Sequence, residues 1–192
     1  MVELAKPLRW ANAGDALQLA ELVNFAGEGM PLHLWSSMTK DGEDPWEFGR
    51  RRQAKKAKQG EIVVMDFGSG AVAGLTGYAI GPEPEEIGPG FPAMFRPLQE
   101  LENQALNTWY VNVLACYPEH RGKGHGSCLL GLAEELCKSK GLKQLSLIVA
   151  SNNTGAKRLY ERTGFVQVAK AKCVKETWKT DMEHWELLIK PI

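Results

Sequence analysis

Apolar and polar residues recur along the chain with two periods, one typical of helices and one typical of strands. Apolar positions three and four residues apart predict helices over residues 16–26, 45–58, 124–140 and 156–163, with a shorter one inside 96–106. Runs rich in β-branched and aromatic residues predict strands over residues 8–11, 61–67, 71–80, 108–116, 144–150, 165–174 and 184–190. Because 192 residues is an ordinary length for one domain, we expect a single mixed α/β domain over residues 1–192.

Glycines and prolines mark the predicted connections. Asn12, followed by Asp15, predicts a capped start for the first helix, and Gly27, Gly29 and Pro31 predict its end. Irregular segments are therefore expected over residues 27–44, 81–107 and 175–183.

Composition narrows the class of protein. The 23 basic and 23 acidic residues give no net field that would attract nucleic acid or an anionic membrane. No apolar run reaches the roughly 18 residues that a membrane-spanning helix needs, and the first residues do not resemble a signal peptide. We therefore expect a cytoplasmic protein with neither a nucleic-acid nor a membrane partner.

The four cysteines have no metal-binding or disulfide spacing. Cys128 and Cys137 are nine residues apart in one predicted helix, which places them on opposite faces. No histidine cluster accompanies any cysteine, so we expect reduced thiols and no metal site. Cys116 falls in a predicted strand, where a small buried apolar side chain is favoured over a nucleophile.

A glycine-rich turn stands between a predicted strand and a predicted helix. It reads Arg121, Gly122, Lys123, Gly124, His125, Gly126. Alternating glycines let the backbone approach a ligand and adopt positive φ at little cost. The helix that follows directs its positive dipole end at the turn, and Arg121 and Lys123 add full charges. The turn is typical of a site for a diphosphate, whereas the side chain of His125 is expected to face solvent.

Two common phosphate motifs do not fit this turn. A P-loop requires Ser or Thr after Gly-Lys, but Gly124 follows Lys123 here. A dinucleotide fingerprint requires a third glycine, but the spacing places Ser127 or Leu129 at that position.

The turn instead contains Arg-x-x-Gly-x-Gly, which resembles the acetyl-CoA motif of the GNAT superfamily of N-acetyltransferases. The segment from Asn153 to Phe165 is similar to the second signature of that superfamily, Asn-x-x-Ala-x-x-Leu-Tyr-x-x-x-Gly-Phe. The two motifs frame residues 109–165 in the order that the superfamily requires. The resemblance implies a GNAT-like acyl-CoA N-acyltransferase fold, with a mixed central β-sheet flanked by helices.

The resemblance also implies roles for individual residues. Acetyl-CoA would be the co-substrate, with its diphosphate on the amides from Arg121 to Gly126. The backbone of Leu114, Ala115 and Cys116 would face the pantetheine arm and the thioester. Asn153 and Tyr160 would both contact the cofactor, and Asn153 could cap a helix at the same time. Tyr160 would also be the general acid, with a buried core tyrosine as the alternative.

The general base is where the chain departs from many members of the superfamily, because the predicted strand 144–150 offers no carboxylate. Glu28 and His33 are our candidates for the base and for substrate binding, and Asn112 is a further candidate for substrate binding. Solvated or half-buried side chains are the alternative for Glu28 and His33.

Three functions therefore stay open at this point. The first is an N-acetyltransferase that acts on a primary amine of a small molecule or peptide by direct attack. The second is a non-catalytic sensor that binds CoA or acetyl-CoA on the same fold. The third is an RNA-associated protein that uses the basic residues of 50–58, although a solvated helix surface explains these charges better. The sequence leaves the acceptor amine, the length of the acyl group and a homodimer open.

Overall fold

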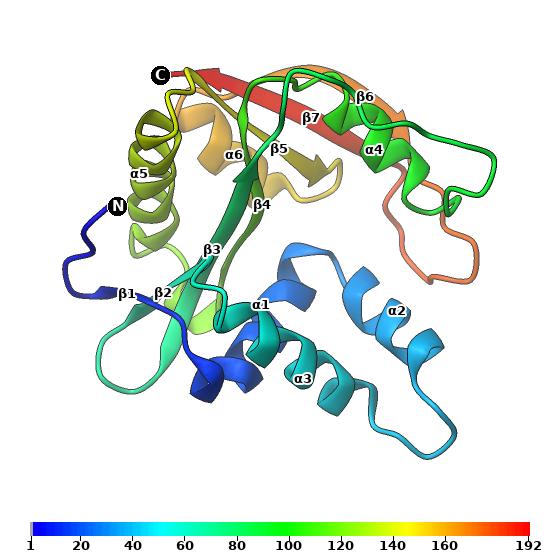
Figure 1. Cartoon of the computed structure of the whole chain (residues 1–192), viewed down its shortest axis with the longest axis horizontal. Helices are drawn as coiled ribbons and strands as arrows, with labels where there is room; N and C mark the ends of the chain where they lie inside the picture. Colours follow the sequence, from blue (N-terminus) through cyan, green and yellow to red (C-terminus); the bar gives the residue numbers. More distant parts are fainter. Residues whose placement is uncertain (1) are drawn as a thin grey trace. The chain divides into compact units, whose positions relative to one another are not determined.

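The computed structural model describes residues 2–192 (Figure 1). Within this range, seven strands form one sheet. Its strand order is β1-β2-β3-β4-β5-β7-β6. The strands are β1 (Leu8–Trp10), β2 (Ile62–Asp66), β3 (Ala71–Ala79), β4 (Trp109–Cys116), β5 (Gln144–Ala150), β6 (Val166–Lys172) and β7 (His184–Pro191). The β4–β5 pair is parallel, whereas β1–β2, β2–β3, β5–β7 and β6–β7 are antiparallel. The predicted mixed sheet is confirmed.

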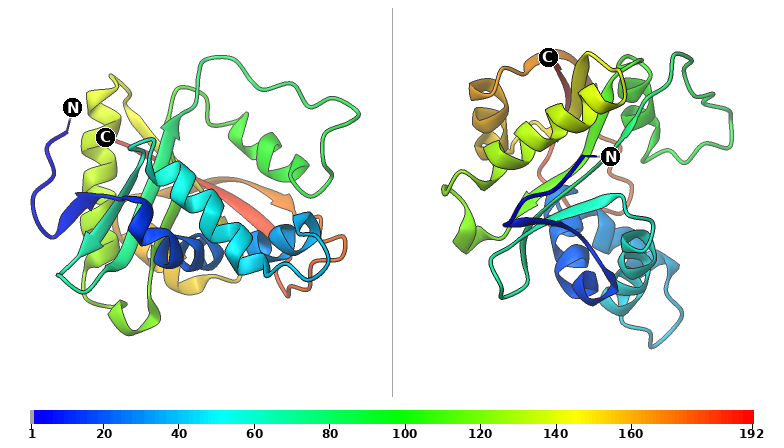
Figure 2. Two further views of the ribbon diagram at one scale, coloured as in Figure 1. Left: turned by 60° about the horizontal axis from the view of Figure 1, so that its bottom comes forward. Right: turned by 60° about the vertical axis from the view of Figure 1, so that its left-hand side comes forward.

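Helices flank this sheet. They are α1 (Ala16–Ala26), α2 (Met30–Met38), α3 (Pro45–Ala57), α4 (Arg96–Glu102), α5 (His125–Ser139) and α6 (Thr154–Arg162), with 3₁₀ turns η1 (Ala13–Asp15) and η2 (Pro118–His120). Figure 2 shows a long irregular segment between β3 and α4. The predicted short helix inside 96–106 and the predicted strands are confirmed to within a few residues at each end.

The prediction of an irregular segment over residues 27–44 is wrong, because α2 occupies residues 30–38. Gly29 has a φ of 85° and turns the chain sharply after α1. Pro31 then lies in the first helical turn, where the missing N–H costs nothing. The same residues that end α1 therefore start α2.

The chain divides into two compact units. Unit 1 comprises the residues up to Gly77 and Val113–Leu130, and unit 2 comprises Tyr78–Asn112 and Gly131–Ile192. The expectation of a single domain over residues 1–192 stays a prediction.

In unit 1, the helices α1 and α3 cover the buried strand β2. Leu19, Ala57 and Val64 belong to one buried apolar cluster contributed by these three elements. The helix α3 also packs against α2, where Trp35 and Trp46 meet edge to face with ring centroids 5.9 Å apart. Gly49 is required at this crossing, because a Cβ there would come within 2.4 Å of the Trp35 ring.

Two of the basic residues of α3 pair with acidic residues of their own unit. Arg50 pairs with Glu47, and Arg51 pairs with Glu43. The guanidinium groups of Arg51 and Arg52 also lie 5.8 Å from the centre of the Phe48 ring. This arrangement agrees with a solvated helix surface rather than a nucleic-acid-binding face.

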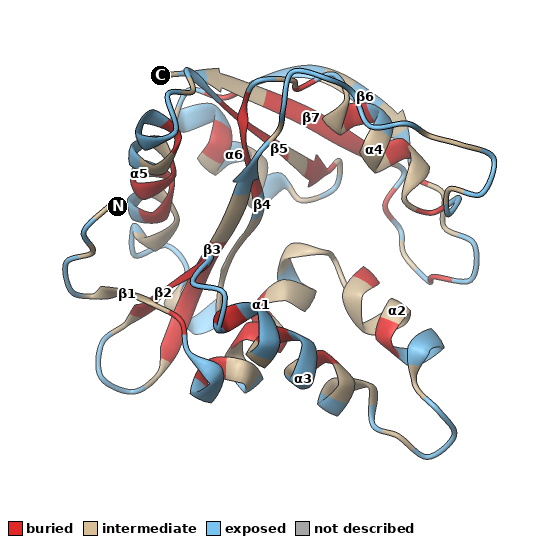
Figure 3. Ribbon diagram, viewed as in Figure 1, coloured by how far each residue is buried: buried red, intermediate tan, exposed pale blue. Residues whose placement is uncertain are grey.

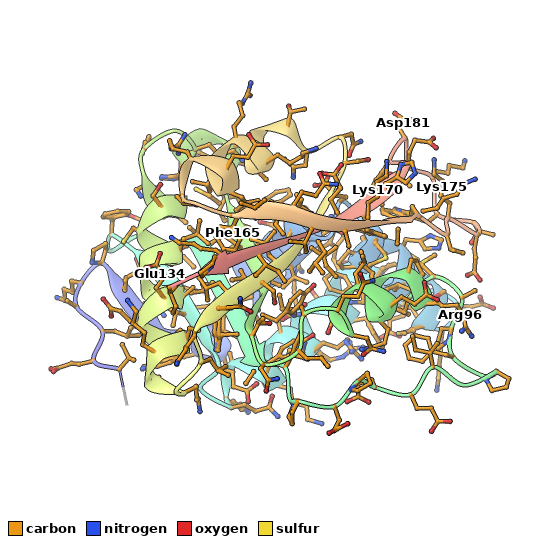
Figure 4. All side chains as sticks on the ribbon, turned by 90° about the horizontal axis from the view of Figure 1, so that it is seen from above. Arg96, Glu134, Phe165, Lys170, Lys175 and Asp181 are labelled. Carbon is orange, nitrogen blue, oxygen red and sulfur yellow. The ribbon has the colours of Figure 1, made fainter. Side chains whose placement is uncertain are left out.

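In unit 2, the core lies along β5, which is buried over most of its length, and along the buried residues 185–188 of β7 (Figure 3). Leu145, Leu147 and Leu187 are almost completely inaccessible to solvent. Figure 4 labels Glu134 on α5, whose carboxylate pairs with Lys190 of β7 at 2.5 Å. Burial of this strand pair provides the rigid frame on which α4 and α6 are held.

Candidate functional site

The glycine turn between η2 and α5 has the left-handed backbone that its sequence predicts. Gly122 has a φ of 74° and Gly124 a φ of 86°. A Cβ atom at either position would meet no heavy atom within 4 Å, so the conformation, not lack of space, requires glycine. At both positions, therefore, only glycine adopts this backbone conformation without strain.

Several amides of the turn are available to a ligand. The hydrogen bonds found outside the helices of residues 2–192 have no donor among the amides of Gly122, Gly124, His125 and Gly126. These amides stand at the amino-terminal end of α5, a 15-residue helix whose dipole favours an anion there. Residues 121–124 are exposed, so a ligand can reach them.

The two basic side chains of the turn are also accessible. Arg121 donates from Nε to the carbonyl oxygen of Cys116 at 3.1 Å, which holds its side chain beside the end of β4. Lys123 is exposed. Available amides, a helix amino terminus and two cations together fit a diphosphate group.

His125 differs from the expectation of a solvent-facing side chain, since it is half-buried. Its ring lies 5.4 Å from that of Phe67 and 6.4 Å from that of His120. Phe67, at the β2–β3 turn, thus contacts the first residue of α5.

Tyr117 anchors the turn to α1, a contact that sequence reasoning missed. Its hydroxyl donates to the carboxylate of Glu21, and its ring meets Phe25 edge to face at 5.7 Å. Burial and the nearby Glu21 carboxylate raise the pKa of Tyr117 well above its ordinary value. The partners are 96 residues apart in sequence, so no local pattern reveals them.

The end of β4 carries Leu114, Ala115 and Cys116, all half-buried. The β4–β5 ladder pairs Trp109–Val111 with Leu145–Leu147, so these three residues extend beyond the last paired position. Burial raises the pKa of the Cys116 thiol, and the charges of Arg121 and Lys123 offset this only in part. Cys116 is therefore a protonated, half-buried thiol at neutral pH, which agrees with the expected apolar role.

Asn153 and Tyr160 belong to unit 2, where α6 positions both. The side-chain oxygen of Asn153 accepts a hydrogen bond from the amide of Ala156 at 3.1 Å, so Asn153 caps α6 as expected. Tyr160 is only 7% exposed, and its ring meets Phe165 edge to face at 5.7 Å. The tyrosine ring is thus part of the core, and packing restricts its orientation.

Unit 2 also contains a group of acidic and aromatic side chains that sequence reasoning missed. Tyr78 donates from its hydroxyl to Glu102 Oε2 at 2.8 Å, and its ring lies 5.3 Å from that of Tyr110. Asn112, two residues beyond Tyr110 on β4, is exposed. The side chains of Tyr110 and Asn112 therefore lie on the same face of β4.

Glu28 and His33 lie on unit 1, near the start of α2. Glu28 has a φ of 54° in the turn between α1 and α2, and His33 is a half-buried residue of α2. Their proposed roles in the reaction stay predictions.

Within residues 2–192, no three His, Cys, Asp or Glu side chains are grouped so that they could hold a metal ion. No helix in the same range has both the length and the apolar character needed to span a bilayer.

Comparison with known proteins identifies the family. Residues 31–165 match the model of the acetyltransferase (GNAT) family. The chain belongs to this family. It is 41% identical over 56 residues to an uncharacterized N-acetyltransferase of Bacillus subtilis (strain 168), YycN. It is 43% identical over 54 residues to a putative ribosomal protein bS18-alanine N-acetyltransferase of the same organism. These matches cover 29% and 28% of the chain, and 36% of the length of each relative.

Solved GNAT structures agree over nearly the whole chain. The mosquito protein named arylalkylamine N-acetyltransferase like 5b has a TM-score of 0.66 at 18% identity. The match covers 96% of this chain and 99% of that protein's chain. A ribosomal-protein-alanine N-acetyltransferase from Brucella melitensis has a TM-score of 0.61 at 18% identity, with coverage of 96% and 99%. At these identities the likeness establishes the fold, and the expected GNAT-like fold is confirmed.

Proposed function

We propose that this chain transfers an acetyl group from acetyl-CoA to a primary amine of a small molecule or peptide. The observation that carries the proposal is the turn before α5, with its left-handed glycines, available amides and two exposed cations. Membership of the GNAT family supports the same reading.

In this proposal, the chain holds the co-substrate through its backbone. The amides from Arg121 to Gly126 bind the diphosphate, with the side chains of Arg121 and Lys123 as counter-charges. The backbone of residues 114–116 and the side chain of Asn153 contact the rest of the molecule. Acetyl-CoA supplies the acetyl group as a thioester, which is already activated toward an amine.

Tyr160 is proposed to protonate the sulfur that leaves. A phenol keeps its proton at neutral pH and can donate it to a thiolate. The packing of Tyr160 against Phe165 supports this role, because a ring that is already held in place loses little entropy when its hydroxyl donates a proton to the sulfur.

The acceptor side is assigned to Glu28, His33 and Asn112, with Glu28 as the candidate base. Direct attack by the amine is favoured over a covalent enzyme intermediate, because the raised pKa of Cys116 keeps the thiol protonated.

The test is an assay of free thiol released from acetyl-CoA over a panel of amines, with wild-type protein and Tyr160→Phe. We expect turnover with at least one amine, and a roughly 10²-fold lower kcat in the variant with unchanged affinity for acetyl-CoA. Binding of acetyl-CoA without turnover of any amine would favour a non-catalytic sensor instead.

A further inference from the structure

Unit 2 contains a carboxylate that is held by a tyrosine but has no cationic partner. Glu102 ends α4, and its Oε2 accepts the hydroxyl proton of Tyr78 at 2.8 Å. Within residues 2–192, no Lys, Arg or His side chain forms an ion pair with Glu102. A half-buried negative charge without a counter-ion is costly to maintain, and a cationic ligand would offset that cost.

The fold fixes this carboxylate from two sides. The amide of Ile80 donates to Thr108 at 2.9 Å, a register that places Tyr78 opposite Tyr110 two residues further along. The side chain of Asn103 bonds both backbone groups of Glu85, at 2.9 Å and 2.8 Å, which ties the end of α4 to the irregular segment. The group is therefore positioned by backbone contacts and not by chance proximity.

The carboxylate is joined to a pair of aromatic rings through Tyr78. Tyr110 is 5% exposed and contacts Tyr78, whereas Tyr78 is 43% exposed and remains accessible. Aromatic rings can also attract an ammonium group through their π faces. A carboxylate beside two phenol rings is a suitable receptor for a cationic amine.

The same group belongs to the unit that contains the proposed general acid, Tyr160. Burial raises the pKa of Tyr110, and the charges of Glu102, Tyr78 and Tyr160 raise it further. Tyr110 itself contacts Tyr78. The pKa of Glu102 is raised by burial and by Glu85, and lowered by the Tyr78 hydroxyl, which makes this carboxylate a better proton acceptor than an exposed one.

We propose that Glu102, held by Tyr78, receives the acceptor as an ammonium ion and takes the proton that it must lose. This inference rests on the proposed acetyl transfer. It gives the acceptor class as a cationic primary amine, and it assigns to α4 the base for which the sequence offered only Glu28 and His33.

The proton balance is complete with groups already named. Glu102 accepts one proton from the ammonium ion and later releases it to solvent. The neutral nitrogen forms the new C–N bond while the C–S bond of the thioester breaks. Tyr160 gives its proton to the leaving sulfur and is reprotonated by the second proton that the nitrogen loses.

The experiment compares Glu102→Gln with Glu100→Gln, an exposed glutamate of the same helix. Thiol release is measured at saturating acetyl-CoA with phenethylamine, spermidine and a peptide that begins with alanine. For the best of these amines we expect Glu102→Gln to lower kcat/KM by about 10²-fold, with no change in the KM for acetyl-CoA. Glu100→Gln should behave as wild type, and thermal unfolding checks that both variants fold.

The dependence on pH separates proton removal from a structural role. Without the carboxylate, the variant must use amine that is already neutral, so its deficit should shrink as pH rises toward the amine pKa. Tyr78→Phe removes the hydrogen bond that lowers the Glu102 pKa, so the acidic limb of the wild-type profile should move to higher pH.

Three results would overturn the inference. Glu102→Gln could retain wild-type kcat/KM, its deficit could be constant with pH, or the pH-dependent loss could appear in Glu28→Gln instead. A wild-type protein that turns over no amine would reject the proposed acetyl transfer itself, which distinguishes the two failures.

Discussion

Replacing Gly124 by alanine tests whether the turn before α5 is held in the shape that the ligand requires. The glycine has a φ of 86°, and an added Cβ would meet nothing within 4 Å, so the only cost is conformational. For a non-glycine residue that cost is about 1–2 kcal/mol. If the free turn keeps its shape, the cost appears as lost stability. If the turn relaxes, the cost appears as a roughly 5- to 30-fold loss of affinity for acetyl-CoA. The two losses together should therefore total about 1–2 kcal/mol.

Gly131 is the matched control, because it lies within α5 and its Cβ would also meet nothing within 4 Å. Gly131→Ala should stabilise the protein by about 0.5–1 kcal/mol, since alanine favours a helix interior, and should leave affinity unchanged. Urea unfolding and calorimetric titration with acetyl-CoA measure both quantities. If Gly124→Ala changes neither stability nor affinity, the argument from the positive φ is refuted.

Three further predictions concern single side chains. Asp15 accepts two hydrogen bonds from Arg9, which hold its pKa below the ordinary value. The stabilisation from the ionised Asp15 is present above its unfolded-state pKa and is lost as pH falls through its folded-state pKa. Asp15→Asn should therefore lower the free energy of unfolding by about 2 kcal/mol at pH 7, and by less near pH 3, as measured by urea unfolding. The pKa of Glu102 is raised instead, so its contribution is greatest at low pH and is lost as pH rises through the folded-state value. Glu102→Gln should therefore raise the Tm at pH 8 relative to wild type but not at pH 4. A lower Tm of the variant at pH 8 would contradict the claim that burying the charged carboxylate destabilises the protein. Cys116→Ala should retain acetyl transfer within about 3-fold, because a protonated thiol is no nucleophile; a loss of two orders of magnitude in the thiol-release assay would point to a covalent intermediate.

The parts of the site that were predictable are those set by local sequence. The turn from Arg121 to Gly126 and the cap at Asn153 each depend on a few consecutive residues, so their conformations follow from glycine and asparagine chemistry. The helix α2 was missed because Gly29 and Pro31 serve equally as an end signal and a start signal.

Long-range contacts could not be predicted from the sequence, for a different reason. Glu102 and Tyr78 are 24 residues apart, and the irregular segment between them has no period from which their approach could be inferred. In the sequence, the acidic residues of that segment indicate only a general surface charge. The β3–β4 register and the position of α4 are needed to show that Glu102, among them, meets Tyr78.

The binding of acetyl-CoA compared with acetyl-pantetheine, which lacks the diphosphate, tests the central claim most directly. Calorimetric titration of the folded wild-type protein should give a dissociation constant for acetyl-CoA at least about 100-fold lower than for acetyl-pantetheine, since charge-assisted hydrogen bonds to a diphosphate contribute several kcal/mol. Equal affinities, or no heat with acetyl-CoA, would contradict the assignment of the turn at Arg121–Gly126 as a diphosphate site.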